Sequence, residues 1–138
     1  MVDTEVSVAL WLFGDFDPDE ISRLLELTPS SQGQPRTGRW PRGASWTLSS
    51  DDHVKSDLFE PHIEWVLASV EPRATALAKL ISGGAEAHIN CDWSSVGSSG
   101  GPVISVESMS RLTALGLPLV ISFYAIRDES DESDAAPC

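Results

Sequence analysis

The loop at residues 35–43 gathers the side chains best suited to binding an anion. It places Arg36, Arg39 and Arg42 around Trp40, and these three account for a third of the nine basic residues in the chain. A guanidinium group can bind a carboxylate or a phosphate through two parallel hydrogen bonds, and it stacks readily on an indole ring. The loop is therefore a candidate anion-binding site. The alternative is a solvated loop whose arginines pair with the protein's own acids.

A second set of polar residues lies at alternate positions of a β-rich stretch, residues 86–93. The polar residues share one face: Glu86, His88, Asn90 and Asp92. The apolar residues share the other: Ala87, Ile89, Cys91 and Trp93. Alternate residues on a strand are about 6.5–7 Å apart, so His88 and Asp92 are too distant to bind one metal ion directly. Because His88 and Cys91 point to opposite faces, they cannot form a nucleophile–base pair. We expect an exposed strand face here.

The other candidate motifs indicate no reaction. The Gly- and Ser-rich stretch 97–102 lacks the Gly-Lys-Ser/Thr ending of a phosphate-binding loop and precedes an expected strand, not a helix. Cys91 is expected to be a small buried hydrophobic residue, and two unrelated cysteines predict no disulfide framework. His62 is expected to be solvated. Without a nucleophile–base pair, a metal site or a cofactor fingerprint, the sequence favours a non-enzymatic protein with no cofactor.

The net negative charge of the chain argues against some classes of binding partner. The sequence has 21 acidic and 9 basic residues, a formal net charge of −12. Five of the acids follow residue 127, and without them 16 acids remain against 9 bases, a net of −7. An acidic body repels phosphate backbones, so no nucleic-acid partner is expected. No apolar run approaches the roughly 20 residues that span a bilayer, and the acidic N-terminus does not resemble a signal peptide. These features predict a cytoplasmic protein with no membrane partner.

One α+β domain over residues 1–127, followed by a disordered acidic tail at 128–138, must position these side chains. Hydrophobic patterns predict about five strands, at residues 6–13, 46–49, 86–93, 103–106 and 119–126. Helices are expected from the Asp17 cap to Pro29, from Asp57 to Gly83 with a break at Pro72, and over 109–115. Residues 29–44 are expected to form a loop, and 86–106 a hairpin. The order β-α-β-α-β-β-α-β predicts a ferredoxin-like antiparallel or mixed sheet with helices on one face.

Helices on one face would leave the other face of the sheet open. The first strand is apolar on both faces, so its second face, with Trp11 and Phe13, needs a cover or a partner. We expect these two rings, with Trp46 or Trp93, to project from the open face as a surface for a partner, a ligand or self-association. The alternative is that loops or the long helical segment cover them.

Several short motifs, taken together and in order, resemble a bacterial family of unknown function, domain-of-unknown-function family 4279. They cover most of residues 6–126: Asp19-Glu20-Ile21, Leu24-Leu25-x-Leu27-x-Pro29, Gly33-x-Pro35-Arg36, Trp46-Thr-Leu-Ser-Ser, Val103-Ile-Ser-Val-Glu, Leu112-x-x-Leu115-Gly116 and Leu119-x-Ile121-x-Phe123-Tyr124. The family carries no established activity. The resemblance therefore implies a kind of domain and no catalytic residues.

Two classes of function remain open. The first is a non-enzymatic cytoplasmic protein-interaction domain, such as an immunity-type protein that binds a basic partner, or a domain that self-associates as a homodimer. The second is a small anionic-ligand-binding module or enzyme that uses the Arg-rich loop 35–43. The residues assigned to binding under these two hypotheses are Arg36, Arg39, Trp40, Arg42, Trp46 and Trp11. Small size, acidity and the apolar sheet face favour the first.

Overall fold

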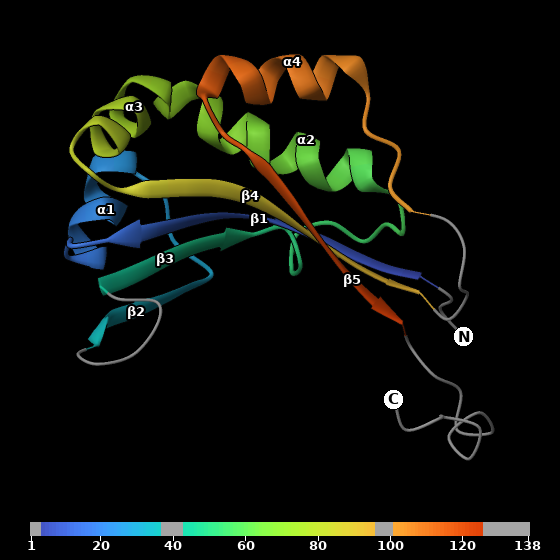
Figure 1. The fold of residues 1–138 in the computed structure, drawn as a ribbon, viewed down its shortest axis with the longest axis horizontal. Helices are drawn as coiled ribbons and strands as arrows, with labels where there is room; N and C mark the ends of the chain where they lie inside the picture. Colours follow the sequence, from blue (N-terminus) through green and yellow to red (C-terminus); the bar gives the residue numbers. More distant parts are fainter. Residues whose placement is uncertain (1–3, 37–42, 96–100, 126–138) are drawn as a thin grey trace, which may run out of the picture.

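A computed structural model describes residues 4–36, 43–95 and 101–125. Its elements follow in chain order: β1 (Thr4–Gly14), α1 (Pro18–Leu25), β2 (Ser31–Arg36), β3 (Gly43–Ser49), α2 (Phe59–Val70), the 3₁₀ turn η1 (Glu71–Arg73), α3 (Ala74–Ser82), β4 (Glu86–Ser95), α4 (Val106–Leu115) and β5 (Leu119–Ala125). The strands form one twisted sheet, and the helices cover one of its faces (Figure 1). The expected α+β class, with helices on one face, is confirmed.

The sheet has five strands in the order β2-β3-β1-β4-β5. The central strand β1 pairs antiparallel with both neighbours, so that Leu10 lies between Leu48 of β3 and Ile89 of β4. This central place agrees with the two-sided apolar pattern of β1. The β4–β5 pair is parallel, which makes the sheet mixed. The finer expectation, a ferredoxin-like arrangement, is not confirmed.

The hydrophobic core fills the space between the sheet and the helices. One face of the sheet supplies Val8, Leu10, Leu12, Trp46, Leu48, Ile89 and Cys91. The helices supply Ile21, Leu25, Ile63, Val66, Leu67, Val70, Leu77 and Leu112. Cys91 is fully buried, as expected from its place in the alternating pattern. At about 25 cal/mol per Å² of apolar surface removed from water, this layer is the main source of stability.

Two expected elements are wrong, and tertiary contacts explain both. Residues 31–36 form β2 and not a loop, because their backbone pairs with β3, with Gln32 opposite Trp46. An edge strand tolerates Pro35 because one side of its backbone needs no partner. Residues 103–106 do not form a strand in a hairpin. The Ser105 side chain instead accepts a hydrogen bond from the Ser108 amide and starts α4 at Val106, which joins β4 to β5 as a parallel crossover.

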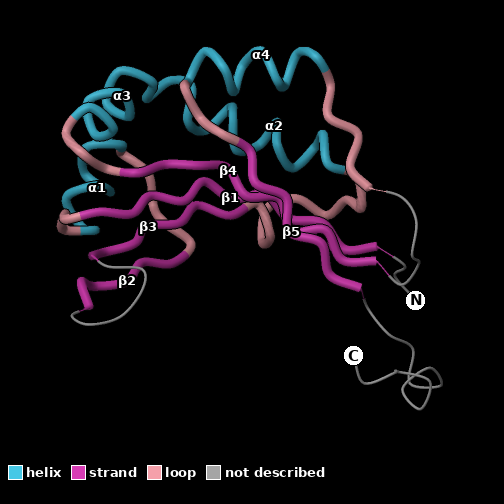
Figure 2. The backbone as a smooth tube through the Cα atoms, in the orientation of Figure 1, coloured by secondary structure: helices cyan, strands magenta, loops and turns pink. Residues whose placement is uncertain are grey.

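The other helices agree more closely with the expected pattern. Asp17 caps α1 by accepting a hydrogen bond from the Asp19 amide, with Pro18 as the first helical residue. The break at Pro72 is confirmed as the 3₁₀ turn between α2 and α3, two helices that lie on the same side of the sheet (Figure 2). The expected cap at Asp57 is wrong, because the N-cap of α2 is Leu58, without a side-chain hydrogen bond. Of the helices in the described ranges, none has the length and apolarity to cross a bilayer. The expected tail at 128–138 lies outside the described residues.

Candidate functional site

The sheet face opposite the helices carries a stack of three aromatic rings, Trp11, Phe13 and His88, called here the aromatic stack. Trp11 and Phe13 are two residues apart on β1, so they share a face, and their ring centroids are 5.5 Å apart at 13°. Antiparallel pairing places His88 of β4 directly opposite Trp11. Its imidazole stacks on Phe13 at 5.8 Å and 23°. Such offset pairs stabilise one another beyond the burial of their surfaces.

A groove of about 960 Å³ runs along the aromatic stack. The residues that line it beside the three rings are Gly14, Asp15, Gly84, Glu86, Ala87, Pro118 and Val120. Glu86 is paired with Phe13 across β1 and β4, while Asp15 follows the end of β1. Both carboxylate side chains are exposed. The groove therefore combines flat aromatic faces with two carboxylates at one end of the sheet.

His88 contributes a ring to this groove and not a charge. Partial burial lowers the pKa of its imidazole, while the nearby Glu86 carboxylate acts in the opposite direction and raises it. The first effect is the larger, so the imidazole is neutral at pH 7. The charge of the groove consequently comes from Asp15 and Glu86. Aromatic faces flanked by carboxylates are complementary to a cation.

Polar side chains continue the open face beyond the aromatic stack. The Asn90 amide donates to Asp92 Oδ1 at 2.9 Å and accepts from the Ser122 hydroxyl at 3.2 Å. The bond from Ser122 ties β5 to β4, whereas the bond between Asn90 and Asp92 lies within β4. Within the described ranges, no three His, Cys, Asp or Glu side chains come together to hold a metal ion.

Comparison with known protein families places nearly all of the described chain in one family. A family model described as a domain of unknown function, DUF4279, matches residues 4–125. The chain belongs to the DUF4279 family. The match begins with β1 and ends with β5, so the family unit is the whole sheet with its helices. No significant match is found for this DUF4279 domain among curated proteins or among solved structures.

The sequence-predicted site residues of this DUF4279 domain do not form one site. Trp11 lies on the open face, as expected. Trp46 does not: it is fully buried on the helix side, where its indole N–H donates to the Ser22 hydroxyl at 3.0 Å. Trp93 is also on the helix side, packed against the core. The pairing of β3 with β1, which no local pattern in the sequence indicates, puts Trp46 opposite Leu12 on the core face.

The Arg-rich loop joins β2 to β3, and most of it lies outside the described residues. Arg39, Trp40 and Arg42 belong to the undescribed range 37–42, whereas the backbone of Arg36 ends β2 opposite Gly43. Gly43 has a φ of 87°, and a Cβ there would meet the Gly14 carbonyl oxygen at 2.6 Å. Only glycine fits so close an approach. The loop thus starts and ends beside the end of β1 that also carries the groove.

A serine–histidine pair that sequence reasoning missed lies inside the fold. Ser50 Oγ is 2.6 Å from His62 Nδ1, and His62 Nε2 is 2.8 Å from the Ser56 carbonyl oxygen. A carbonyl can only accept, so Nε2 carries the proton and Nδ1 accepts from the Ser50 hydroxyl. The expectation that His62 is solvated is wrong, because it is 1% exposed. Its place three residues after Phe59 and four before Val66, on the apolar stripe of α2, was the available signal.

This pair has a structural role. Ser50 is fully buried, and its hydroxyl also accepts a hydrogen bond from the Val8 amide at 3.0 Å. A nucleophilic serine must reach its substrate, whereas this hydroxyl is enclosed between β1 and α2. The pair therefore fixes α2 to the central strand.

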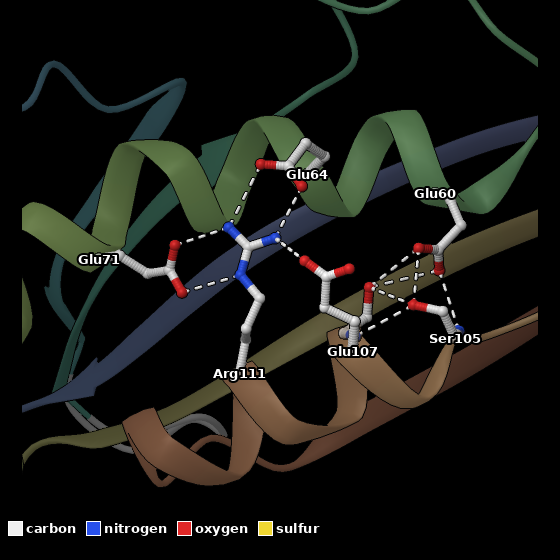
Figure 3. A network of polar contacts seen from close by, with 7 residues as sticks. Glu60, Glu64, Glu71, Ser105, Glu107 and Arg111 are labelled. Atoms are coloured by element: carbon white, nitrogen blue, oxygen red, sulfur yellow. Dashed lines mark hydrogen bonds and ion pairs between the residues drawn. The ribbon is translucent and has the colours of Figure 1, made fainter.

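A second polar network fastens α4 to α2 (Figure 3). The Arg111 guanidinium of α4 points between two carboxylates, bonding Glu64 at 2.7 and 3.2 Å and Glu71 at 2.6 and 2.9 Å. Glu107 is 3.9 Å away on the preceding turn. The guanidinium lowers the pKa of the Glu71 carboxyl, and the carboxylates raise the pKa of Arg111 above its usual range. Bidentate pairs of this kind fix orientation as well as distance.

The other end of the same helix pair is joined by Glu60. Its carboxylate accepts hydrogen bonds from the Ser105 amide at 3.1 Å and from the hydroxyls of Ser105 and Ser108 at 2.9 and 3.0 Å (Figure 3). The start of α4 is therefore capped both by its own Ser105 and by a carboxylate of α2. We assign this network to the positioning of α4 and not to a ligand.

Proposed function

We propose that this domain is a non-enzymatic, cytoplasmic protein-interaction module that binds a basic protein partner at the open face of its sheet, as an immunity-type protein would. One observation carries the proposal: the aromatic stack of Trp11, Phe13 and His88 forms one wall of a groove that also bears Asp15 and Glu86. A lysine or arginine side chain of the partner would lie on the rings and pair with the carboxylates.

The charge of the protein supports a basic partner over an acidic one. The strands β1, β3, β4 and β5 contain no lysine or arginine, and the whole chain carries a formal charge of −12. A field of one sign accelerates the approach of a partner of opposite sign and disfavours partners of the same sign. The groove then supplies the short-range contacts that such a field lacks.

The test is capture of the partner from the native host with the parent protein and three variants of it. Glu86→Gln and Glu20→Gln change the net charge equally, but Glu20 lies on α1, away from the groove. We expect Trp11→Ala and Glu86→Gln to weaken binding of the captured protein roughly tenfold or more, and Glu20→Gln to leave it near the parent value. Equal losses for the two charge variants, or capture of no basic protein by the parent, would contradict the proposal.

A second candidate function is the binding of a small anionic ligand by the Arg-rich loop. One observation favours it: the loop joins strands whose ends, Arg36 and Gly43, are paired beside Gly14 and the groove. Thermal-shift measurements with inorganic phosphate, citrate and nucleotides test this function. A ligand present at 100 times its dissociation constant raises the free energy of unfolding of the protein by about 2.7 kcal/mol. The anion hypothesis fails if no anion raises the melting temperature of the parent. It also fails if the anion raises the melting temperature of Arg39→Ala by the same amount.

A further inference from the structure

The strand β5 is the edge of the described sheet beyond β4, and its sequence leaves that edge open to another strand. Its seven residues, Leu119–Ala125, include no charge, no proline and no glycine. Three of its side chains are exposed, on both faces of the sheet: Val120 at 43%, Phe123 at 62% and Tyr124 at 54%. Leu119 and Ile121 pack against the core. A long, uncharged, apolar edge strand is a template for pairing, and proteins usually protect it.

The opposite edge of the sheet is protected. β2 contains Gly33 and Pro35, and its register with β3 shifts between Gly33 and Arg36. A proline without an N–H group and an irregular register both oppose the addition of a strand. The contrast between the two edges indicates that β5 is kept available. We propose that two copies of this protein pair through β5, antiparallel, across a two-fold axis, and form one continuous sheet.

The backbone of β5 presents the groups that this pairing needs. The Pro118 carbonyl accepts from the Ile89 amide, so it faces β4. Backbone groups of successive residues in a strand point to opposite edges. The amides and carbonyls of Leu119, Ile121 and Phe123 therefore point outward, where no strand of the described ranges meets them.

Two-fold symmetry and full overlap of the two seven-residue strands together select one register. Centring the pair on Ser122 aligns all seven residues, so that Ile121 and Phe123 of opposite copies exchange both backbone hydrogen bonds. The same register sets Val120 against Tyr124 on one face and Ile121 against Phe123 on the other. Cross-strand pairs of aromatic and β-branched side chains each contribute favourably. The side chains exposed in the single copy thereby become partners.

The distribution of charge favours the antiparallel arrangement. The five acids of residues 128–138 begin three residues after the end of β5. In a parallel pair, the two acidic segments would leave the sheet side by side. In the antiparallel pair, the two chains leave β5 roughly 20 Å apart, at about 3.3 Å per residue, which exceeds the Debye length of about 8 Å in physiological salt. An association of two acidic copies should also tighten as salt is raised.

The first experiment measures the mass of the full chain by sedimentation equilibrium over a range of protein and NaCl concentrations. We expect a dimer that tightens with salt. Phe123→Lys should raise its dissociation constant roughly tenfold or more, because each of two symmetric ammonium groups loses water at the new interface. Val106→Lys, a matched change at an exposed valine of α4, should leave the dimer intact. Circular dichroism confirms that each variant is folded.

The second experiment tests the register by cross-linking in a Cys138→Ser background. Ser122→Cys places two thiols directly opposite each other, at a spacing that allows a disulfide, and mild oxidation should give a covalent dimer. Val120→Cys places the two thiols several residues apart, so oxidation should give no covalent dimer. A monomer at every concentration, a dimer insensitive to Phe123→Lys, or equal cross-linking of the two cysteine variants would each overturn the proposal. A dimer that is lost in Trp11→Lys but kept in Phe123→Lys would also overturn the proposal, because the two copies would then associate through the groove and not through β5.

Discussion

At the scale of single residues, the molecule separates groups that could do chemistry from groups that hold the fold. Ser50 and His62 have the identities and spacing of a catalytic pair, yet both are buried and their hydrogen bonds end on the protein's own backbone. Cys91 is similar, because burial raises the pKa of its thiol to about 11 and keeps it unreactive at pH 7. Trp11, Phe13 and His88 are only partly buried, so the surface chemistry of this face is aromatic.

Replacing Ser50 by alanine should destabilise the protein by about 2–4 kcal/mol. The change leaves the Val8 amide and His62 Nδ1 buried without their partner, and each unsatisfied group costs about 1–3 kcal/mol. Urea unfolding followed by tryptophan fluorescence measures the loss. Ser49→Ala is the control, since the Ser49 hydroxyl accepts only an exposed hydrogen bond from the Asp51 amide and its removal should cost about 0.5 kcal/mol. Similar losses for the two variants would contradict the structural role of Ser50.

His88 should titrate below an unfolded histidine, and its pKa should fall further in Glu86→Gln. Burial lowers the pKa, and the Glu86 charge that partly offsets this effect is lost in the variant. Because the unfolded state then binds protons more readily than the folded state, the contribution of His88 to stability is present above the unfolded pKa, about 6.5, and is lost as pH falls from there through the lowered native pKa. NMR titration of the imidazole measures both values. Glu20→Gln should not move them.

At the scale of elements, α4 is the helix that depends most on polar contacts. It buries Ser108 and Leu112, while Arg111 and Ser105 bind three carboxylates of α2 and the following turn. Partly exposed ion pairs hold an element in place but add modest stability. The crossover between β4 and β5 is thus positioned by polar contacts with α2 as well as by Leu112.

Arg111→Gln should destabilise the fold by about 1–3 kcal/mol, because Glu64, Glu71 and Glu107 would then face one another without a cation. Glu71→Gln should destabilise the fold more than Glu107→Gln does. The Glu107 carboxylate is largely exposed and lies 3.9 Å from Arg111, too far for a hydrogen bond. The contribution of Glu71 is present above the ordinary carboxyl pKa and is lost as pH falls through its lowered native value. Thermal unfolding between pH 3 and pH 7 measures these differences. Equal effects of the two glutamate changes would contradict this assignment.

Sequence patterns predicted the parts of the fold that local signals determine, and missed the parts that pairing determines. The alternation in β4, the Asp17 cap, the break at Pro72 and the end of α4 at Gly116 all depend on neighbouring residues. By contrast, β2 contains Gly33 and Pro35 and is a strand only because β3 lies beside it. Residues 103–105 are rich in β-branched types, yet Glu60 binds Ser105 and favours the start of a helix.

The candidate site was predictable in part. The open face and Trp11 followed from the two-sided pattern of β1. His88 could not be joined to Trp11 and Phe13 from the sequence, because their contact depends on the register between β1 and β4, which no local signal specifies. The buried place of Trp46 was missed for the same reason.

At the scale of the whole molecule, repulsion between the many negative charges destabilises the folded state. A chain with 21 acids and 9 bases repels itself when folded, and much of that repulsion is screened by salt. The Arg111 ion pairs act in the opposite direction, since salt weakens them. With a net charge of −12, we expect self-repulsion to dominate.

Raising NaCl from about 20 to 300 mM should therefore increase the melting temperature by about 2–5 °C. Deleting residues 128–138, which reduces the net charge to −7, should reduce that increase. Differential scanning calorimetry of the two forms, at a protein concentration where both have the same oligomeric state, measures the effect. A melting temperature that falls with salt would show that ion pairs outweigh repulsion.

The central place of β1 has a consequence for synthesis of the protein. Val8 pairs with Cys91, so a nascent chain must wait for most of the domain before its most apolar strand finds that neighbour. At about 5–20 residues per second, the delay is several seconds. During that time β1 can pair only with β3, and its edge toward β4 has no strand to pair with. A ribosome stalled before β4 would accordingly present an apolar strand with one unpaired edge.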